Sequence, residues 1–99
     1  MKIFAIEKER PGVTPDRYQP YLRPEAAKVW ELYQNGHVRE AYFNAEKHTA
    51  VLVLECSDLQ EANNLLQTLP LVEAGLITFD LLPLVPYDGF VRLFEVIES

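Results

Sequence analysis

His37 and Arg39, two side chains suited to acid–base and anion-binding chemistry, stand two residues apart in the sequence. Residues at this spacing on a β-strand point to the same face of the sheet. A guanidinium binds a carboxylate through paired hydrogen bonds, and an imidazole gains or loses a proton near neutral pH. The pair predicts a site where Arg39 binds a substrate carboxylate and His37 transfers a proton. The plainer interpretation is a solvated His37 and an Arg39 paired with a surface carboxylate.

Glu55 joins this site in only one register of a predicted hairpin. A three-residue loop over 45–47 pairs Asn44 with His48, which sets Glu55 opposite His37 as an acid–base partner. A loop of two or four residues turns Glu55 to the other face of the sheet. Outside such a pair, Glu55 is interpreted as a cap or a surface charge.

Two tyrosines, Tyr18 and Tyr21, flank a proline-rich break before the first long helix. A helix start at this place can face the mouth of a pocket, so their hydroxyls are candidate ligand-binding groups. Trp30 and Tyr33 follow on the apolar stripe of the same helix, and we expect both in the core.

The remaining motifs exclude several kinds of chemistry. His37 and His48 lack Cys or carboxylate companions at a metal-binding spacing, so no metal site is expected. The sequence has no Gly-rich phosphate loop, no Gly-x-Ser-x-Gly elbow and no His-Glu-x-x-His helix, so no cofactor is expected. The single cysteine, Cys56, excludes an internal disulfide and is interpreted as a small buried side chain. The remaining possibilities are acid–base chemistry on a small organic molecule, or binding alone.

Length and charge bound the class of protein. Ninety-nine residues, 48% of them hydrophobic, suffice for one domain over 1–99, with a core over about 2–85 and a C-terminal extension over 86–99. A net charge of −6 argues against nucleic-acid and anionic-membrane partners. The N-terminal apolar run is too short for a signal peptide, and no apolar stretch reaches the roughly 20 residues of a membrane helix. We expect a cytoplasmic protein.

The elements that position these residues follow from hydrophobic periodicity. Thr14-Pro15-Asp16 predicts a short opening turn, and Pro20 and Pro24 place the main helix start near Pro24. A capping box over 57–60 begins a second helix that ends at Pro70. Strands are expected over 2–7, 37–44, 48–56 and 76–82. The segment 90–97 suits either a helix or an added strand.

The order strand, helix, strand, strand, helix, strand is that of the α+β ferredoxin-like fold, βαββαβ, with a four-stranded antiparallel sheet. Two helices cover one face, so the other is polar in a monomer. Here both faces are apolar: Ile3 and Ala5 alternate with Phe4 and Ile6 on the first strand, and Val51 and Val53 alternate with Leu52 and Leu54 on the third. A second copy covering the other face predicts a homodimer or a higher homo-oligomer.

Two short motifs carry a resemblance to a known family. Gly36-x-x-Arg39 begins the second strand directly after the first helix, and Leu69-Pro70-Leu71 closes the second helix. With the element order and length, they make the chain similar to the muconolactone isomerase-like proteins of the dimeric α+β barrel superfamily. The resemblance covers about 2–85, and the tail Pro86-Tyr87-Asp88-Gly89-Phe90 departs from it.

The resemblance implies a cofactor-independent isomerase that moves a proton on a small carboxylated lactone. Arg39 would anchor the carboxylate, while His37, with or without Glu55, carries the proton. The absence of a strong catalytic motif favours the alternative of a non-catalytic small-ligand-binding or assembly module. A monooxygenase of the same superfamily, acting on an aromatic or haem-like ligand, is the third hypothesis and needs a pocket.

Overall fold

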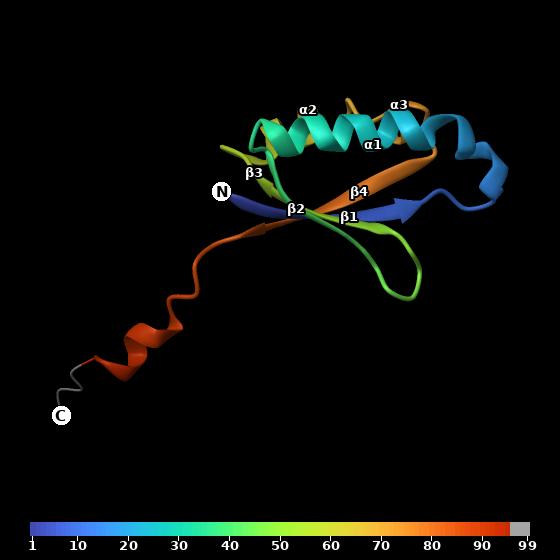
Figure 1. The fold of residues 1–99 in the computed structure, drawn as a ribbon. Helices are drawn as coiled ribbons and strands as arrows, with labels where there is room; N and C mark the ends of the chain where they lie inside the picture. The colour runs from blue at the N-terminus through green and yellow to red at the C-terminus, as the bar shows by residue number, and fades with distance from the viewer. Residues whose placement is uncertain (96–99) are drawn as a thin grey trace.

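The computed structural model describes residues 1–95 of the chain. Its strands are β1 (Lys2–Glu9), β2 (Val38–Phe43), β3 (Ala50–Glu55) and β4 (Ile77–Leu84). The helices are α1 (Gln19–Gln34), α2 (Leu59–Leu66) and α3 (Pro70–Glu73), with short 3-10 turns η1 (Pro15–Arg17) and η2 (Gly89–Leu93). The helices lie together on one side of the sheet, while the C-terminal segment leaves the fold (Figure 1).

The four strands form one antiparallel sheet in the order β2-β3-β1-β4. This order, with a helix between β1 and β2 and helices between β3 and β4, is the predicted ferredoxin-like arrangement, which is confirmed. β4 pairs only with β1, so it is an edge strand, and an edge strand accommodates Pro83.

Alternation along the strands builds the core on the helix-covered face. Ile3 and Ala5 of β1 are fully buried, opposite Leu54 and Leu52 of β3. α2 supplies Ala62 and Leu66 to the same cluster, and Leu69, which follows the helix as the N-cap residue of α3, joins them there, as the apolar spacing predicts.

The start of α2 differs from the predicted capping box by one residue. Asp58, not Ser57, is the N-cap, and its carboxylate accepts the Glu61 amide at 2.8 Å. Glu61 reaches back to the amide and hydroxyl of Ser57, at 3.2 Å each. Pro70 does not end α2; it begins α3, because a proline at the first helical position loses no hydrogen bond.

The predicted start of the main helix near Pro24 is wrong. α1 begins at Gln19, and Pro20 lies in its first turn, where the amide has no intrahelical partner in any case. Pro24 lies inside the helix and removes only its own bond to the carbonyl four residues back. The two prolines are therefore accommodated in one continuous helix.

The expectation that Trp30 and Tyr33 are core residues is also wrong for this chain by itself. Their exposed fractions are 59% and 51%, and their rings stack on each other at 5.6 Å. Leu32 is the buried residue of α1 instead, with Val29 packed against the core. The C-terminal half of α1 reaches the main core cluster through Leu32 and Val29, and Tyr21 in its N-terminal half packs against the smaller cluster of Leu71, Leu76 and Ile77.

The outer face of the sheet carries apolar side chains that no element of the described chain covers. Phe4, Ile6 and Leu82 alternate with the buried residues of β1 and β4, and Ile6 and Leu82 are exposed. Asp80, on the same face, pairs at 2.7 Å with Lys8. Among the described residues, no helix is long and apolar enough to cross a membrane.

Replacing Leu69 by Ala is expected to destabilise the fold by about 2–5 kcal/mol, because Leu69 is fully buried between α2, α3 and the sheet. Urea unfolding followed by circular dichroism measures this change. Leu59→Ala is the matched control, since Leu59 is 40% exposed. Equal losses for the two variants would contradict the assigned core.

Candidate functional site

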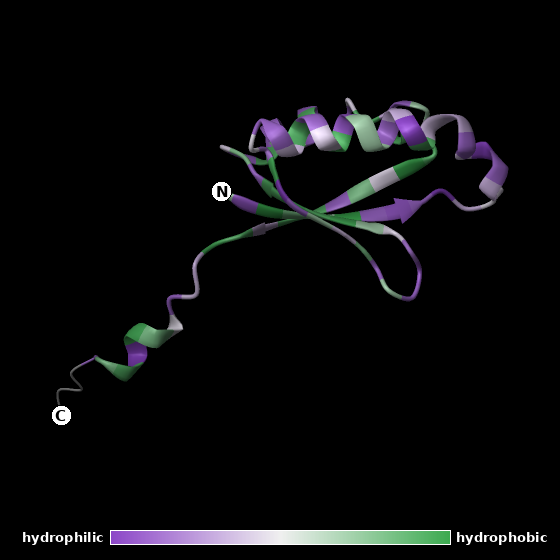
Figure 2. Cartoon of the chain, viewed as in Figure 1, coloured by the Kyte–Doolittle hydropathy of each residue, from purple (hydrophilic) through white to green (hydrophobic). Residues whose placement is uncertain are grey.

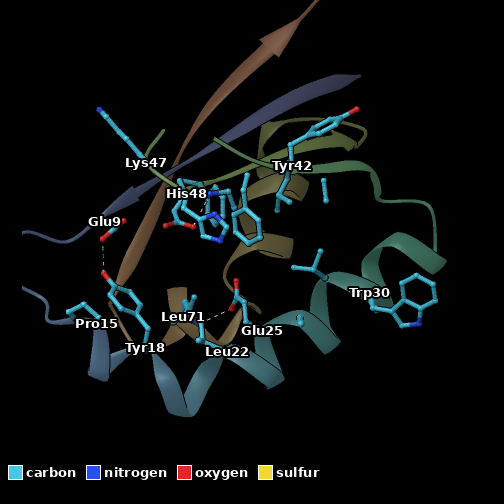
Figure 3. A pocket seen from close by; sticks show the side chains of 18 of the residues that line it. Glu9, Pro15, Tyr18, Leu22, Glu25, Trp30, Tyr42, Lys47, His48 and Leu71 are labelled. Atoms are coloured by element: carbon cyan, nitrogen blue, oxygen red, sulfur yellow. Dashed lines mark hydrogen bonds between the residues drawn. The ribbon is translucent and has the colours of Figure 1, made fainter. Parts of the chain in front are cut away.

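A mostly apolar cavity of about 980 Å³ lies between α1 and the helix-covered face of the sheet. Its walls come from one side of α1, the C-terminal end of β1, the β2–β3 hairpin and single residues of α3 and β4: Glu7, Glu9, Tyr18, Leu22, Glu25, Ala26, Val29, Trp30, Phe43, His48, Leu52, Leu71 and Phe79 among others. The volume is at the upper end of the range for small-molecule sites. Figure 3 shows the labelled side chains around this space.

Glu7 continues the buried face of β1 that Ile3 and Ala5 begin, so its carboxylate is directed toward the helices. One carboxylate oxygen accepts the Ala50 amide at 3.1 Å, where the β1–β3 pairing stops. Burial raises the pKa of Glu7, Glu9 adds to the rise, and the Ala50 hydrogen bond and His48 oppose it. Glu7 is thus a half-buried carboxyl group with an enhanced tendency to keep a proton.

Glu25 is the second half-buried carboxyl group of the cavity. It projects from α1 and accepts the Leu71 amide of α3 at 2.9 Å (Figure 3). That amide lies in the first turn of α3, whose N-cap residue Leu69 provides no side-chain cap. Burial raises the pKa of Glu25, the Leu71 hydrogen bond opposes this, and the charge of Glu7 adds to the rise. The two carboxyl groups are therefore electrostatically coupled within one apolar site.

His48 lies on the sheet side of the cavity, and Glu25 projects toward this side from α1 (Figure 3). Its ring stacks on Phe43 at 4.1 Å, and its backbone has a positive φ of 57°. In this left-handed conformation the His48 amide donates to the Asn44 carbonyl at 2.8 Å and closes the hairpin. Lys47, its neighbour, also lines the rim.

Of the two tyrosines predicted to bind a ligand, only Tyr18 lines the cavity. Tyr18 lines the cavity, and its hydroxyl donates to Glu9 at 3.4 Å. Partial burial and the Glu9 charge raise the pKa of Tyr18. Tyr21 lies outside the cavity walls and packs against the small cluster of Leu71, Leu76 and Ile77.

His37 and Glu55 do lie opposite each other, but by a different route from the predicted loop. Asn44 donates to Thr49 at 2.7 Å, so four residues, not three, form the hairpin loop. A β-bulge between Val38 and Glu40 then shifts the register by one residue, and the Glu55 amide donates to the His37 carbonyl at 2.8 Å. The bulge thus compensates for the longer loop.

The side chains at this end of the sheet do not meet as an acid–base pair. Glu55 binds the amino group of Met1 at 3.1 Å. One ring nitrogen of His37 contacts Asn35 at 2.9 Å, and the other is 3.8 Å from Glu61. Arg39 is exposed at the bulge, and none of these three predicted site residues lines the cavity.

Within residues 1–95, no three His, Cys, Asp or Glu side chains group closely enough to hold a metal ion. Cys56 is buried, as expected, and burial raises the pKa of its thiol, with the charge of Glu61 adding to the rise.

Glu7, Glu25 and His48 were not predicted as site residues, although two of them leave a signal in the sequence. Glu7 falls on the odd-numbered apolar face of β1, and Glu25 is spaced three from Leu22 and four from Val29 on α1. A carboxyl group on a buried face needs a partner, and this pattern marks both residues. The positive φ of His48 has no comparable signal.

Comparisons with known proteins show a similarity in fold. No protein-family model and no curated protein sequence matches this chain. Among solved structures, a muconolactone isomerase is similar with a TM-score of 0.74 and 15% identity, covering 90% of this chain and 93% of that one. A 5-chloro-2-hydroxyhydroquinone dehydrochlorinase from Burkholderia phenoliruptrix AC1100, in complex with 2,5-dihydroxybenzoquinone, has a TM-score of 0.69 and 15% identity, covering 90% and 98%. The resemblance in fold that the sequence predicts is confirmed.

The stability of the fold is expected to decrease as the pH rises through and above the ordinary glutamate value of 4.5. Because the folded pKa values of Glu7 and Glu25 are raised, the folded state binds more protons than the unfolded state over this window. Urea unfolding between pH 4 and 8 measures the slope. The double variant Glu7→Gln with Glu25→Gln is expected to have a shallower slope, and an unchanged slope would contradict the assigned shifts.

Proposed function

We propose that the protein is a cofactor-independent enzyme that transfers a proton within a small cyclic organic substrate, with Glu25 as its acid–base group. The observation that carries this proposal is the pair of half-buried carboxyl groups, Glu7 and Glu25, in an apolar cavity of ligand size. Raised pKa values bring a carboxyl group closer to the operating pH, where general acid–base catalysis is most efficient.

The proposed step balances without a further reactant. The Glu25 carboxylate takes a proton from a ring carbon, the double bond moves, and the same carboxyl group returns a proton to a different carbon. The substrate keeps its formula, and in heavy water one deuterium enters the product. Glu7 acts on this step through its charge, which helps to raise the pKa of Glu25.

A carboxylated lactone is the proposed substrate class, and the charges of the cavity define its orientation. The inner groups are acidic, so a substrate carboxylate is repelled from Glu7 and Glu25. Lys47 and His48 at the hairpin rim are the basic residues that line the cavity. The carboxylate therefore binds at this rim, and the ring lies toward Glu25.

This proposal moves the reaction away from His37, Arg39 and Glu55. A site at that end of the sheet remains an alternative, in which Arg39 binds the carboxylate as the sequence predicts. The cavity is favoured because it combines ligand size, apolar walls and carboxyl groups with raised pKa values, whereas His37 and Arg39 lie outside it.

We further propose that the uncovered outer face of the sheet is the contact surface of a homodimer. Ile6 and Leu82 are exposed on this face beside the half-buried Phe4 and Val51. A second copy that presents the same face would remove these side chains from water.

The test is proton NMR of muconolactone with the purified protein in heavy water. Double-bond migration with deuterium uptake is expected, and Glu25→Gln is expected to slow it by at least about 100-fold, since an acid–base group contributes about 10²–10⁴-fold. The amide oxygen of Gln still accepts the Leu71 hydrogen bond, so the fold is retained. Glu31→Gln, on the exposed side of α1, is the matched control with full activity.

Three results would contradict the proposal. A loss in His37→Ala or Arg39→Ala with none in Glu25→Gln would place the reaction at the other end of the sheet. Ligand binding in the cavity without conversion of any lactone tested would identify a binding module. Conversion that consumes dioxygen would identify a monooxygenase.

A further inference from the structure

The candidate cavity follows α1 over most of the length of the helix. Its lining residues recur every three or four positions on one side of α1, from Gln19 through Leu22 and Ala26 to Tyr33. Hydrophobic and hydrophilic residues alternate along α1, and the middle of the sheet is hydrophobic (Figure 2). Gln19 and Tyr33 are about 21 Å apart along the helix, at roughly 1.5 Å per residue. A five-membered lactone with a short carboxylate side arm is much shorter, so the proposed reaction uses only part of the cavity.

The ionisable groups of the cavity lie toward one of its ends. Figure 3 shows Glu9, Tyr18 and Lys47 at this end, Trp30 and Tyr42 at the other, and Glu25 between them. Beyond Glu25, the cavity is lined by residues of α1 and β2 that carry no charge at neutral pH: Ala26, Val29, Trp30, Tyr33, Ala41 and Tyr42. This second end therefore suits an uncharged part of a ligand.

The uncharged end has an exposed aromatic surface. The rings of Trp30 and Tyr33 stack with their centroids 5.6 Å apart and an interplanar angle of 20°, so together they form one continuous surface. Trp30 is 59% exposed, Tyr33 51% and Tyr42 56%. Ala26 of α1 and Ala41 of β2 leave space between the two walls, because a methyl group is too small to fill it. An aromatic ring placed here would gain both burial and stacking.

We propose that the substrate is a lactone with an aromatic substituent, whose aryl group lies against Trp30 and Tyr33 while the lactone ring lies at Glu25. This inference rests on the proposed function for the position of the lactone ring, and it adds the substrate class. Glu25 and Tyr33 are about 12 Å apart along α1, at roughly 1.5 Å per residue, which accommodates a phenyl ring beyond the lactone. The carboxylate of the same molecule lies toward Lys47, on the other side of Glu25 (Figure 3).

Binding is tested first, with a ligand that the proposed reaction does not convert. Trp30 is the single tryptophan of the chain, so its fluorescence reports on the aromatic end of the cavity. The probe is 4-(4-nitrophenyl)butanoate, whose nitroaryl group quenches tryptophan emission on contact. Saturable quenching is expected, whereas butanoate, which lacks the ring, is expected to cause none. N-acetyltryptophanamide in place of the protein corrects for light absorbed by the probe.

Isothermal titration calorimetry with the same probe extends the test to variants of the aromatic end. Trp30→Ala is expected to weaken binding about tenfold because an aromatic contact is lost, and Trp30→Phe, which keeps a ring, less. Ala26→Leu fills the space between the walls with a good helix former and is also expected to weaken binding. Leu59→Ala, at an exposed position outside the cavity walls, is the control with unchanged binding. Circular dichroism establishes that each variant is folded.

Turnover tests the substrate class separately from binding. The kcat/KM for a muconolactone that carries a phenyl group on its ring is expected to exceed that for muconolactone at least about tenfold, since the added ring contacts Trp30. Trp30→Ala is expected to remove this preference. Glu25→Gln is expected to slow both substrates alike, because it acts on the proton transfer and not on the aryl group.

The outcomes separate this inference from the proposed function. Turnover of muconolactone without a preference for the phenyl derivative, and without quenching by the nitroaryl probe, would overturn the inference alone. Quenching without turnover of either lactone would contradict the proposed function and confirm the aryl-binding end of the cavity. Trp30 emission that changes with protein concentration but not with the probe would show that a second copy covers this surface, which would also overturn the inference.

Discussion

The cavity depends on two carboxyl groups, those of Glu7 and Glu25. Each is half-buried among apolar side chains and is held there by a hydrogen bond from one backbone amide. Glu25 joins α1 to α3 through the Leu71 amide, and Glu7 joins β1 to β3 through the Ala50 amide. Each bond satisfies an amide that the helix or ladder leaves without a backbone partner, so neither carboxyl group can be removed without cost. The same bonds hold the carboxyl groups in a half-buried position, where burial raises their pKa values.

The fold was predictable because each helix and strand has a hydrophobic pattern within its own residues. Apolar residues alternate along β1 and β3, and Ala62, Leu66 and Leu69 recur at helical spacing. Such a period predicts whether a segment is a helix or a strand and which of its sides is buried. The bulge at Arg39 is not periodic, and it reversed the consequence of the hairpin loop length for Glu55. Trp30 and Tyr33 show a second limit, because a stripe identifies an apolar face without telling whether the same chain covers it.

The candidate site was harder to predict than the fold because its partners are distant in sequence. The Leu71 amide is 46 residues from Glu25, and the Ala50 amide is 43 residues from Glu7. His37 and Arg39 could be predicted as a pair because they are two residues apart in the sequence. The cavity is built by segments that meet only in the folded chain.

The most direct test of the central claim is a carbon-13 NMR titration of the glutamate carboxyl groups, with Glu7 and Glu25 assigned by their Gln variants. The account predicts that both titrate above the ordinary value of 4.5, and that Glu7→Gln lowers the pKa of Glu25 because the coupled charge is gone. Ordinary pKa values for both groups, each unaffected by replacing the other, would contradict a coupled pair in an apolar cavity.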